Sequence, residues 1–159
     1  MKLSFNTNGW NEFSWVDFYT MAADMEFGGI EIHDILSEDL SGKNRPFSSE
    51  QIVGTARKMR EMGLCIPCID LVNDIADESA FEANCADIDA AISKAELLGR
   101  PYIRLRARTN AENDEGVKAL MAKVLPIAEK AGVALLIETV GIYADTATLT
   151  QIKRSYSGT

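Results

Sequence analysis

Short apolar runs alternate with longer amphipathic segments along the whole sequence. The runs have the length and composition of buried strands, and the segments between them place apolar residues three and four positions apart, as an α-helix requires. The polar stretch 36–47 contains Gly42 and Pro46 and predicts a loop. The predicted strands are 3–7, 29–33, 64–72, 101–107 and 133–140, and the predicted helices are 14–27, 48–62, 79–99, 113–131 and one that starts near Asp145 or Thr146.

Helix boundaries are marked by capping residues and glycines. Ser14 has the side chain of an N-cap, and Ser48 or Ser49 could cap the next helix in a near capping-box pattern with Gln51. Gly28 provides a helix stop. The segment 79–99 has the spacing of a helix with one buried face, made of Phe81, Cys85, Ile88, Ile92 and Ala95.

Five successive strand–helix units predict an α/β fold with a parallel sheet and right-handed crossovers. An open doubly wound sheet would usually carry a glycine-rich phosphate turn after its first strand. The sequence there is Asn8-Gly9-Trp10-Asn11, so the pattern favours a (β/α) TIM-barrel-like fold. Since a full barrel has eight units and typically about 250 residues, we expect residues 1–159 to form a single domain that is a partial or truncated barrel.

The composition argues against two classes of binding partner, nucleic acids and membranes. The net charge of −8 disfavours nucleic-acid binding. No apolar run approaches the roughly 18 residues that span a bilayer, and the N-terminus lacks the apolar core of a secretory signal. We therefore expect a cytoplasmic protein with no membrane partner.

Cys65 and Cys68 have the spacing of a redox motif. Such motifs normally begin a helix, whereas these cysteines lie in a predicted strand, where residues three apart are roughly 10 Å apart and point to opposite faces. The three cysteines also give no disulfide framework. We expect neither a redox centre nor a structural zinc site.

Alternation along the strands identifies the residues that face the barrel interior. If Ile30 and Ile32 face the helices, Glu31 and His33 face inward, and Arg104 and Arg106 do so in the fourth strand. Active sites of such barrels lie at the C-terminal ends of the strands. The candidate site residues at that end are Asn6, His33, Asp70, Arg106 and Glu138.

Each candidate also has a structural interpretation. A carboxylate at the end of a buried strand is costly unless it is paired, and Arg104 and Arg106 could pair with Glu31, Asp70 or Glu138. His33 could be a hydrogen-bonded core residue, and Asp70 a polar strand end. Trp10 and Trp15 could be packing residues or a sugar platform.

Three stretches resemble a known family: residues 27–32 (FGGIEI), 95–105 (AELLGRPYIRL) and 125–141 (LPIAEKAGVALLIETVG). In the third, a helix end, an Ala-Gly turn and an apolar strand are followed by Glu138. These stretches are similar to the xylose-isomerase-like TIM-barrel family of sugar isomerases, epimerases and apurinic-site endonucleases. The endonuclease branch uses several histidines, and this sequence has one.

The resemblance implies a divalent metal, manganese, magnesium or zinc. Glu138 matches the family's strand-five glutamate, a metal ligand and often a proton-transfer base, and His33 or Arg106 could hold substrate hydroxyls. The other family ligands lie on strands six to eight, which this sequence lacks, so one carboxylate would leave the metal site incomplete.

Two functions remain open. One is a metal-dependent sugar or sugar phosphate isomerase or epimerase that abstracts a proton beside a carbonyl and needs a missing segment or partner to complete it. The other is a non-catalytic half-barrel that binds or supports other molecules and self-associates, because its two edge strands would be unpaired.

Overall fold

Five strands and six α-helices alternate in the computed structural model, which describes residues 2–10, 12–108 and 114–156. The strands are β1 (Ser4–Asn6), β2 (Gly29–His33), β3 (Cys68–Asp74), β4 (Tyr102–Arg106) and β5 (Leu135–Ile137). The helices are α1 (Trp15–Asp24), α2 (Glu38–Ser41), α3 (Ile52–Glu61), α4 (Phe81–Leu97), α5 (Glu115–Ala131) and α6 (Thr146–Tyr156), with the short 3-10 helices η1 (Glu78–Ala80) and η2 (Gly141–Tyr143).

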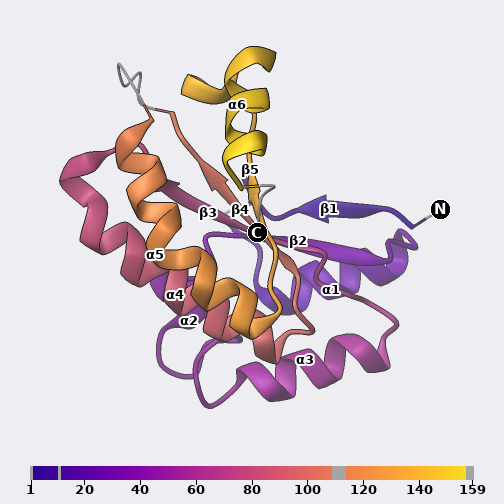
Figure 1. Ribbon diagram of the computed structural model, residues 1–159. Helices are drawn as coiled ribbons and strands as arrows, with labels where there is room; N and C mark the ends of the chain where they lie inside the picture. The colour runs from indigo at the N-terminus through magenta and orange to yellow at the C-terminus, as the bar shows by residue number, and fades with distance from the viewer. Residues whose placement is uncertain (1, 11, 109–113, 157–159) are drawn as a thin grey trace.

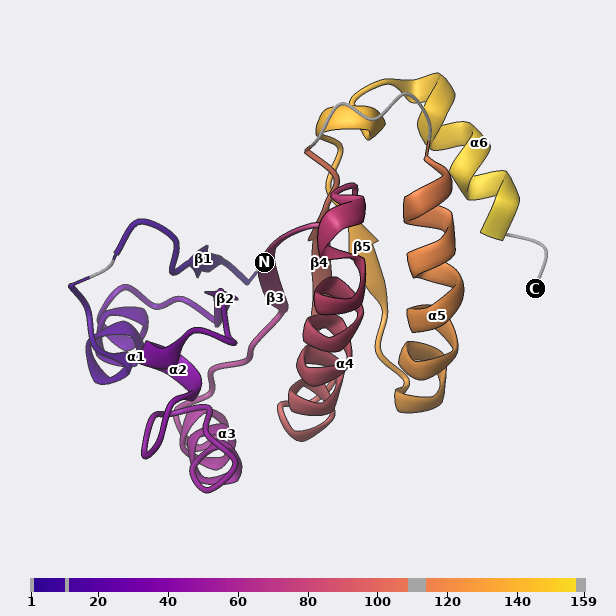
Figure 2. The ribbon, with the colours of Figure 1, turned by 90° about the vertical axis from the view of Figure 1, so that its left-hand side faces the viewer.

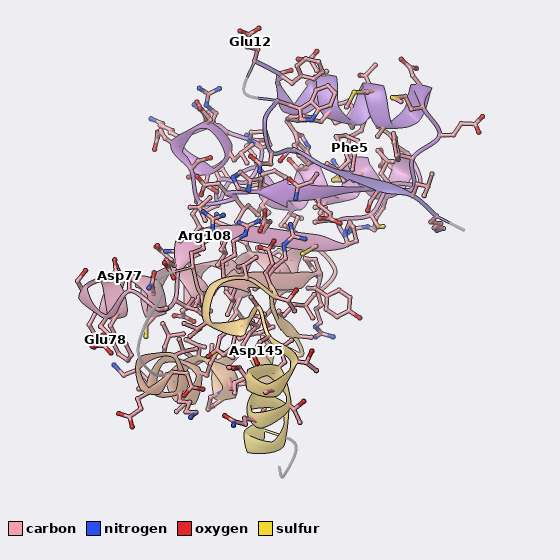
Figure 3. All side chains as sticks on the ribbon, turned by 90° about the horizontal axis from the view of Figure 1, so that it is seen from above. Phe5, Glu12, Asp77, Glu78, Arg108 and Asp145 are labelled. Atoms are coloured by element: carbon pink, nitrogen blue, oxygen red, sulfur yellow. The ribbon has the colours of Figure 1, made fainter. Side chains whose placement is uncertain are left out.

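The strands form one parallel sheet in the order β1-β2-β3-β4-β5. Each strand therefore pairs with its neighbours in sequence, as successive βα units of a barrel do. In Figure 3, Phe5 marks the edge of the sheet formed by β1, and Asp145, just before α6, lies toward the opposite edge. The predicted α/β fold with a partial parallel barrel is confirmed.

Helices α1, α3, α4 and α5 cover one face of the sheet. Figure 1 shows α1, α3, α4 and α5 on the lower side of the strands and α6 on the upper side, and Figure 2 shows α4 and α5 side by side. The core between sheet and helices contains fully buried isoleucines and leucines from three strands, namely Ile30, Ile32, Ile69, Leu71, Ile103 and Leu105. Alternation in the strands thus turns the residues between them to the other face.

The predicted helix starts are right at one position and wrong at another. Ser14 caps α1 in a capping box with Asp17. The predicted cap at Ser48 or Ser49 is wrong, because the N-cap of α3 is Gln51 and makes no side-chain cap bond. The main chain of Ser48 instead accepts hydrogen bonds from the N–H groups of Gln51 and Ile52, so a turn precedes the helix.

Other boundaries differ by a few residues. The predicted loop 36–47 contains the short helix α2, because Ser37 is followed by Glu38 and Asp39, which suit a first helical turn. The predicted start of α5 at Asn113 lies outside the described residues, and the helix begins at Glu115. Strand β3 starts at Cys68 and not at Leu64, since only an isolated bridge joins Cys65 to Gly29.

Gly141 fixes the chain just after β5. Its φ is +56°, and a Cβ built there would lie 1.9 Å from the carbonyl oxygen of Ala107. Only glycine fits so close to another backbone. The turn η2 is therefore packed directly against the end of β4.

Among the described residues, no helix is long and apolar enough to cross a membrane.

Candidate functional site

Strand register places the candidate residues in adjacent rows across the sheet. Asn6 is paired with Glu31, and His33 is paired with Asp70, which is paired in turn with Arg104. Between Asp70 and Asp74 the register of β3 against β4 shifts, so that Arg106 is opposite Asp74. The shift leaves Asp70 with two arginines of β4 within reach.

Asp70 is the centre of a polar cluster on this face. Its Oδ1 accepts a hydrogen bond from Arg104 Nε at 3.1 Å. Its Oδ2 accepts one from Arg106 Nη2 at 2.6 Å and lies 2.9 Å from His33 Nδ1. The Asp70 side chain is only 1% exposed. Both oxygens are thus committed to protein donors, as a buried carboxylate requires.

The donors around Asp70 control its charge. Burial would raise the pKa of Asp70, but the hydrogen bonds from Arg104, His33 and Arg106 outweigh it and lower the pKa to about 2. The hydrogen bond to Asp70 in turn raises the pKa of Arg104. At neutral pH Asp70 is therefore an acceptor only, so the His33 nitrogen that faces it carries the proton.

Glu138 follows β5 and contacts this cluster through Arg106. Its Oε2 accepts a hydrogen bond from Arg106 Nε, and its main-chain N–H donates to Leu105 O at 2.9 Å. Arg106 also donates from Nη1 to Leu71 O at 3.0 Å, so each of its three side-chain nitrogens donates a hydrogen bond. The Glu138 side chain is 34% exposed, whereas that of Arg106 is 7% exposed. Glu138 is therefore oriented by Arg106 and still open to solvent.

Asn6 and His33 complete the cluster from β1 and β2. Asn6 Nδ2 donates to Glu31 Oε2 at 3.3 Å, and the Asn6 Oδ1 accepts from the Asn8 N–H at 2.7 Å. His33 is tied to the loop after β1 because its main-chain N–H donates to Thr7 Oγ1 at 2.9 Å. Arg104 reaches back to Glu31 at 3.5 Å. We call Asn6, Glu31, His33, Asp70, Arg104, Arg106 and Glu138 the polar cluster.

All five predicted site residues belong to this one cluster. The structural interpretation of the arginines is confirmed, since Arg104 pairs with Glu31 and Asp70, and Arg106 pairs with Asp70 and Glu138. Glu31 and Arg104 were not chosen as site residues, although their alternation with buried isoleucines placed them on this face. The two tryptophans differ: Trp15 is 7% exposed and Trp10 is 43% exposed.

The described residues do not fit a complete divalent metal site. Among them, no group of three or more histidine, cysteine, aspartate or glutamate side chains could hold a metal ion. Glu138 has one oxygen on an arginine, and both oxygens of Asp70 face nitrogen donors. A hard cation needs about six oxygen-rich ligands, so this arrangement provides Glu138 at most.

No protein-family model and no curated protein matches the sequence. Solved structures do match. The probable 3-DHS dehydratase AsbF from Bacillus anthracis has a TM-score of 0.77 and 18% identity, covering 99% of this chain and 60% of its own. An L-ribulose 3-epimerase has a TM-score of 0.74 and 17% identity, covering 99% and 58%. The IOLI protein with a bound zinc atom has a TM-score of 0.68 and 17% identity, covering 86% and 51%.

These likenesses show the fold. The chain has the architecture of the xylose-isomerase-like TIM barrels over five of their strand–helix units, as the resemblance in the sequence implied. It spans about 60% of the length of the first of these structures. Fold alone does not determine chemistry, which has to be argued from the polar cluster.

Proposed function

We propose that the polar cluster belongs to the site of a sugar isomerase or epimerase that moves a proton beside a carbonyl group. The observation that carries the proposal is Glu138, a half-exposed carboxylate held by Arg106 at the C-terminal end of a barrel strand. This is the end at which barrel enzymes do chemistry. A structure of an L-ribulose 3-epimerase shares the fold, which supports this class of reaction.

Glu138 is the proton acceptor in this proposal. Arg106 engages Oε2, which fixes the orientation of the carboxylate relative to β4. A general base must be positioned within hydrogen-bond reach of the proton that it removes, and a carboxylate on a rigid strand end meets that need. The C–H bond beside the substrate carbonyl breaks, its proton goes to Glu138, and its electron pair moves onto the carbonyl oxygen to form an enolate. Return of a proton to the enolate completes the isomerisation or epimerisation.

The remaining predicted residues divide into one that binds and three that position. His33 donates from Nδ1 to Asp70, which leaves Nε2 as an acceptor for a substrate hydroxyl. Asp70 holds His33 and both arginines, and it is too buried to contact substrate. The side chains of Asn6 and Arg106 are already hydrogen bonded within the protein, so we propose that they orient Glu31 and Glu138.

We also propose that this chain contributes a single ligand, Glu138, to a divalent metal. A divalent cation, whether manganese, magnesium or zinc, would take Glu138 together with ligands from outside the described residues. The zinc atom of the IOLI structure supports metal use on this fold. We assign no chemical step to the metal.

Proton exchange tests the proposal. The chain is incubated in D₂O with D-fructose or L-ribulose, with and without manganese, and deuterium at the carbon beside the carbonyl is followed by NMR. Glu138→Gln should slow exchange by about 100-fold or more, as loss of a positioned base does. Glu96→Gln, at an exposed site on α4, is the matched control. Equal exchange in both variants would exclude Glu138 as the base.

A second candidate is self-association without catalysis, and the edge of the sheet favours it. β5 has only β4 as a strand partner in the described sheet, and Leu136 on β5 is 41% exposed. Edge strands with exposed apolar side chains promote pairing with another chain. Light scattering should then give a mass above 17.4 kDa, and Leu136→Lys should reduce it. A monodisperse monomer would contradict this candidate.

A further inference from the structure

A cavity of about 230 Å³ adjoins His33 at the C-terminal ends of β1 and β2. It is smaller than the roughly 300–1,000 Å³ of pockets for drug-sized ligands, so it suits a group no larger than a monosaccharide. Thr7 and His33 connect it to the polar cluster through their hydrogen bond. The described residues that line it are Thr7, Trp10, Phe13, Phe18, His33, Asp34, Ser37, Asp39 and Leu40.

One wall of the cavity is aromatic. The ring centroids of Trp10 and Phe13 are 5.1 Å apart, and those of Phe13 and Phe18 are 5.8 Å apart. Trp10 is 43% exposed and Phe13 is 42% exposed, unlike the buried Phe18. Large aromatic side chains left open beside a polar site are typical of binding surfaces. The C–H face of a sugar ring can pack on such rings.

The lining also carries acceptors and negative charge. Asp34 has a left-handed backbone with φ of +52°, held by a hydrogen bond from its N–H to Asp70 O at 2.9 Å. Asp39 is partly neutralised by Arg45, at 3.7 Å between Oδ1 and Nη2. Ser37 and the free nitrogen of His33 add hydrogen-bonding groups. The described lining contains no lysine or arginine.

Three arginines near the cavity are turned toward carboxylates of the protein, and the first of them, Arg45, faces Asp39. Arg104 faces Asp70 and Glu31, and Arg106 faces Asp70 and Glu138. A phosphate or carboxylate entering the cavity would therefore approach Asp34 and Asp39, and of these two only Asp39 has a cation beside it, Arg45. Like charges brought together in this way oppose binding, whereas neutral hydroxyls can donate to the same oxygens.

We propose that this cavity selects an uncharged polyhydroxylated group of the substrate and disfavours phosphorylated and acidic sugars. The inference rests on the proposed sugar-isomerase function and narrows its substrate class. It distinguishes two alternatives that the sequence left open, since both neutral sugars and sugar phosphates were compatible with the residue pattern.

The two tryptophans allow a direct test by NMR. The chain has only two indole N–H groups, of which Trp10 lines this cavity and Trp15 does not. The ¹⁵N-labelled protein is titrated with D-fructose and with D-fructose 6-phosphate at low salt, and Trp10→Phe assigns the signals. D-fructose should shift the Trp10 signal and leave that of Trp15 in place. Its 6-phosphate should bind about tenfold more weakly or worse.

Asp34→Asn tests the electrostatic cause. Asparagine tolerates the left-handed backbone, so the change removes charge with little effect on shape. It should reduce the preference for fructose over its phosphate by about threefold or more. Asp89→Asn, at an exposed site on α4, makes the same charge change elsewhere and should leave the preference unchanged.

The outcomes separate this inference from the proposed function. Equal or tighter binding of the 6-phosphate would overturn the charge selection and leave a sugar site intact. An unchanged preference in Asp34→Asn would also overturn it. Shifts with neither ligand would overturn both the inference and a role for this cavity in sugar binding, whatever the proton-exchange assay shows for Glu138.

Discussion

Asp70 and Glu138 are both carboxylates on the inner face of the sheet, and both accept hydrogen bonds from Arg106, yet their surroundings differ. Asp70 lies on a central strand, is 1% exposed and has donors on both oxygens. Glu138 follows an edge strand, is 34% exposed and accepts a hydrogen bond from Arg106 at Oε2. One carboxylate is enclosed by protein and the other is available to a ligand.

The difference shows how one arginine can connect stability with chemistry. The Arg106 side chain can be nearly buried because Asp70 and the main-chain oxygen of Leu71 accept hydrogen bonds from it. Its third nitrogen, Nε, donates to Glu138. A buried carboxylate with protein donors on both oxygens positions its neighbours, whereas one with solvent access can accept a proton. The comparison therefore predicts separable effects on folding and on activity.

The largest effect is expected from replacing each carboxylate by its amide. Asp70→Asn leaves the buried Arg106 and the partly buried Arg104 facing a neutral group, and breaking a buried pair costs about 3–5 kcal/mol of unfolding free energy. Glu138→Gln should cost less than about 1 kcal/mol, because partly exposed pairs contribute little. Urea denaturation measures both, and similar losses for the two variants would contradict the comparison.

An intermediate effect is expected in acid. The pKa of Asp70 is lowered from 3.8 to about 2, so its contribution is present above pH 4 and is lost as the pH falls through 2. The shift corresponds to about 2 kcal/mol of unfolding free energy. Denaturation at pH values from 5 to 2 should show this loss, and Asp70→Asn should remove that part of the pH dependence. The same slope in the variant would assign it to other groups.

The smallest effect concerns the thiol two residues before Asp70. Burial raises the pKa of Cys68 to about 11, whereas Cys65 is exposed. Alkylation requires the thiolate, so iodoacetamide at pH 8 should modify Cys65 roughly 100-fold faster than Cys68. Peptide mass spectrometry gives both rates. Rapid labelling of Cys68 in the folded protein would mean that water reaches the enclosed side of the cluster.

Alternation along the strands was enough to predict which residues gather on the inner face. Ile30 and Ile32 face the helices, and that fixes the direction of Glu31 and His33 whatever the rest of the fold does. The strand order followed from the repeated units. The sequence could predict the members of the polar cluster because strand alternation and the repeated strand–helix units depend only on local periodicity and on the direction of the chain.

The sequence could not predict which residues of the polar cluster pair with each other. The register shift between Asp70 and Asp74 decides that Arg106 reaches Asp70, and it arises only where β3 and β4 meet. The cavity beside His33 depends on how the segment after β1 folds against α2, a helix that the polar composition of its loop concealed. Such features come from tertiary packing and have no periodic signal.

The order of strands in the sheet has a consequence for how the chain acquires its structure. Because every strand pairs with the one made just before it, most long-range contacts join neighbouring units, and the sheet can grow strand by strand during synthesis. The polar cluster cannot, since Asp70 waits for the arginines of β4, and Glu138 joins only after β5. The polar cluster is thus completed later than the pairing of the first strands, because it needs residues from β4 and from the end of β5.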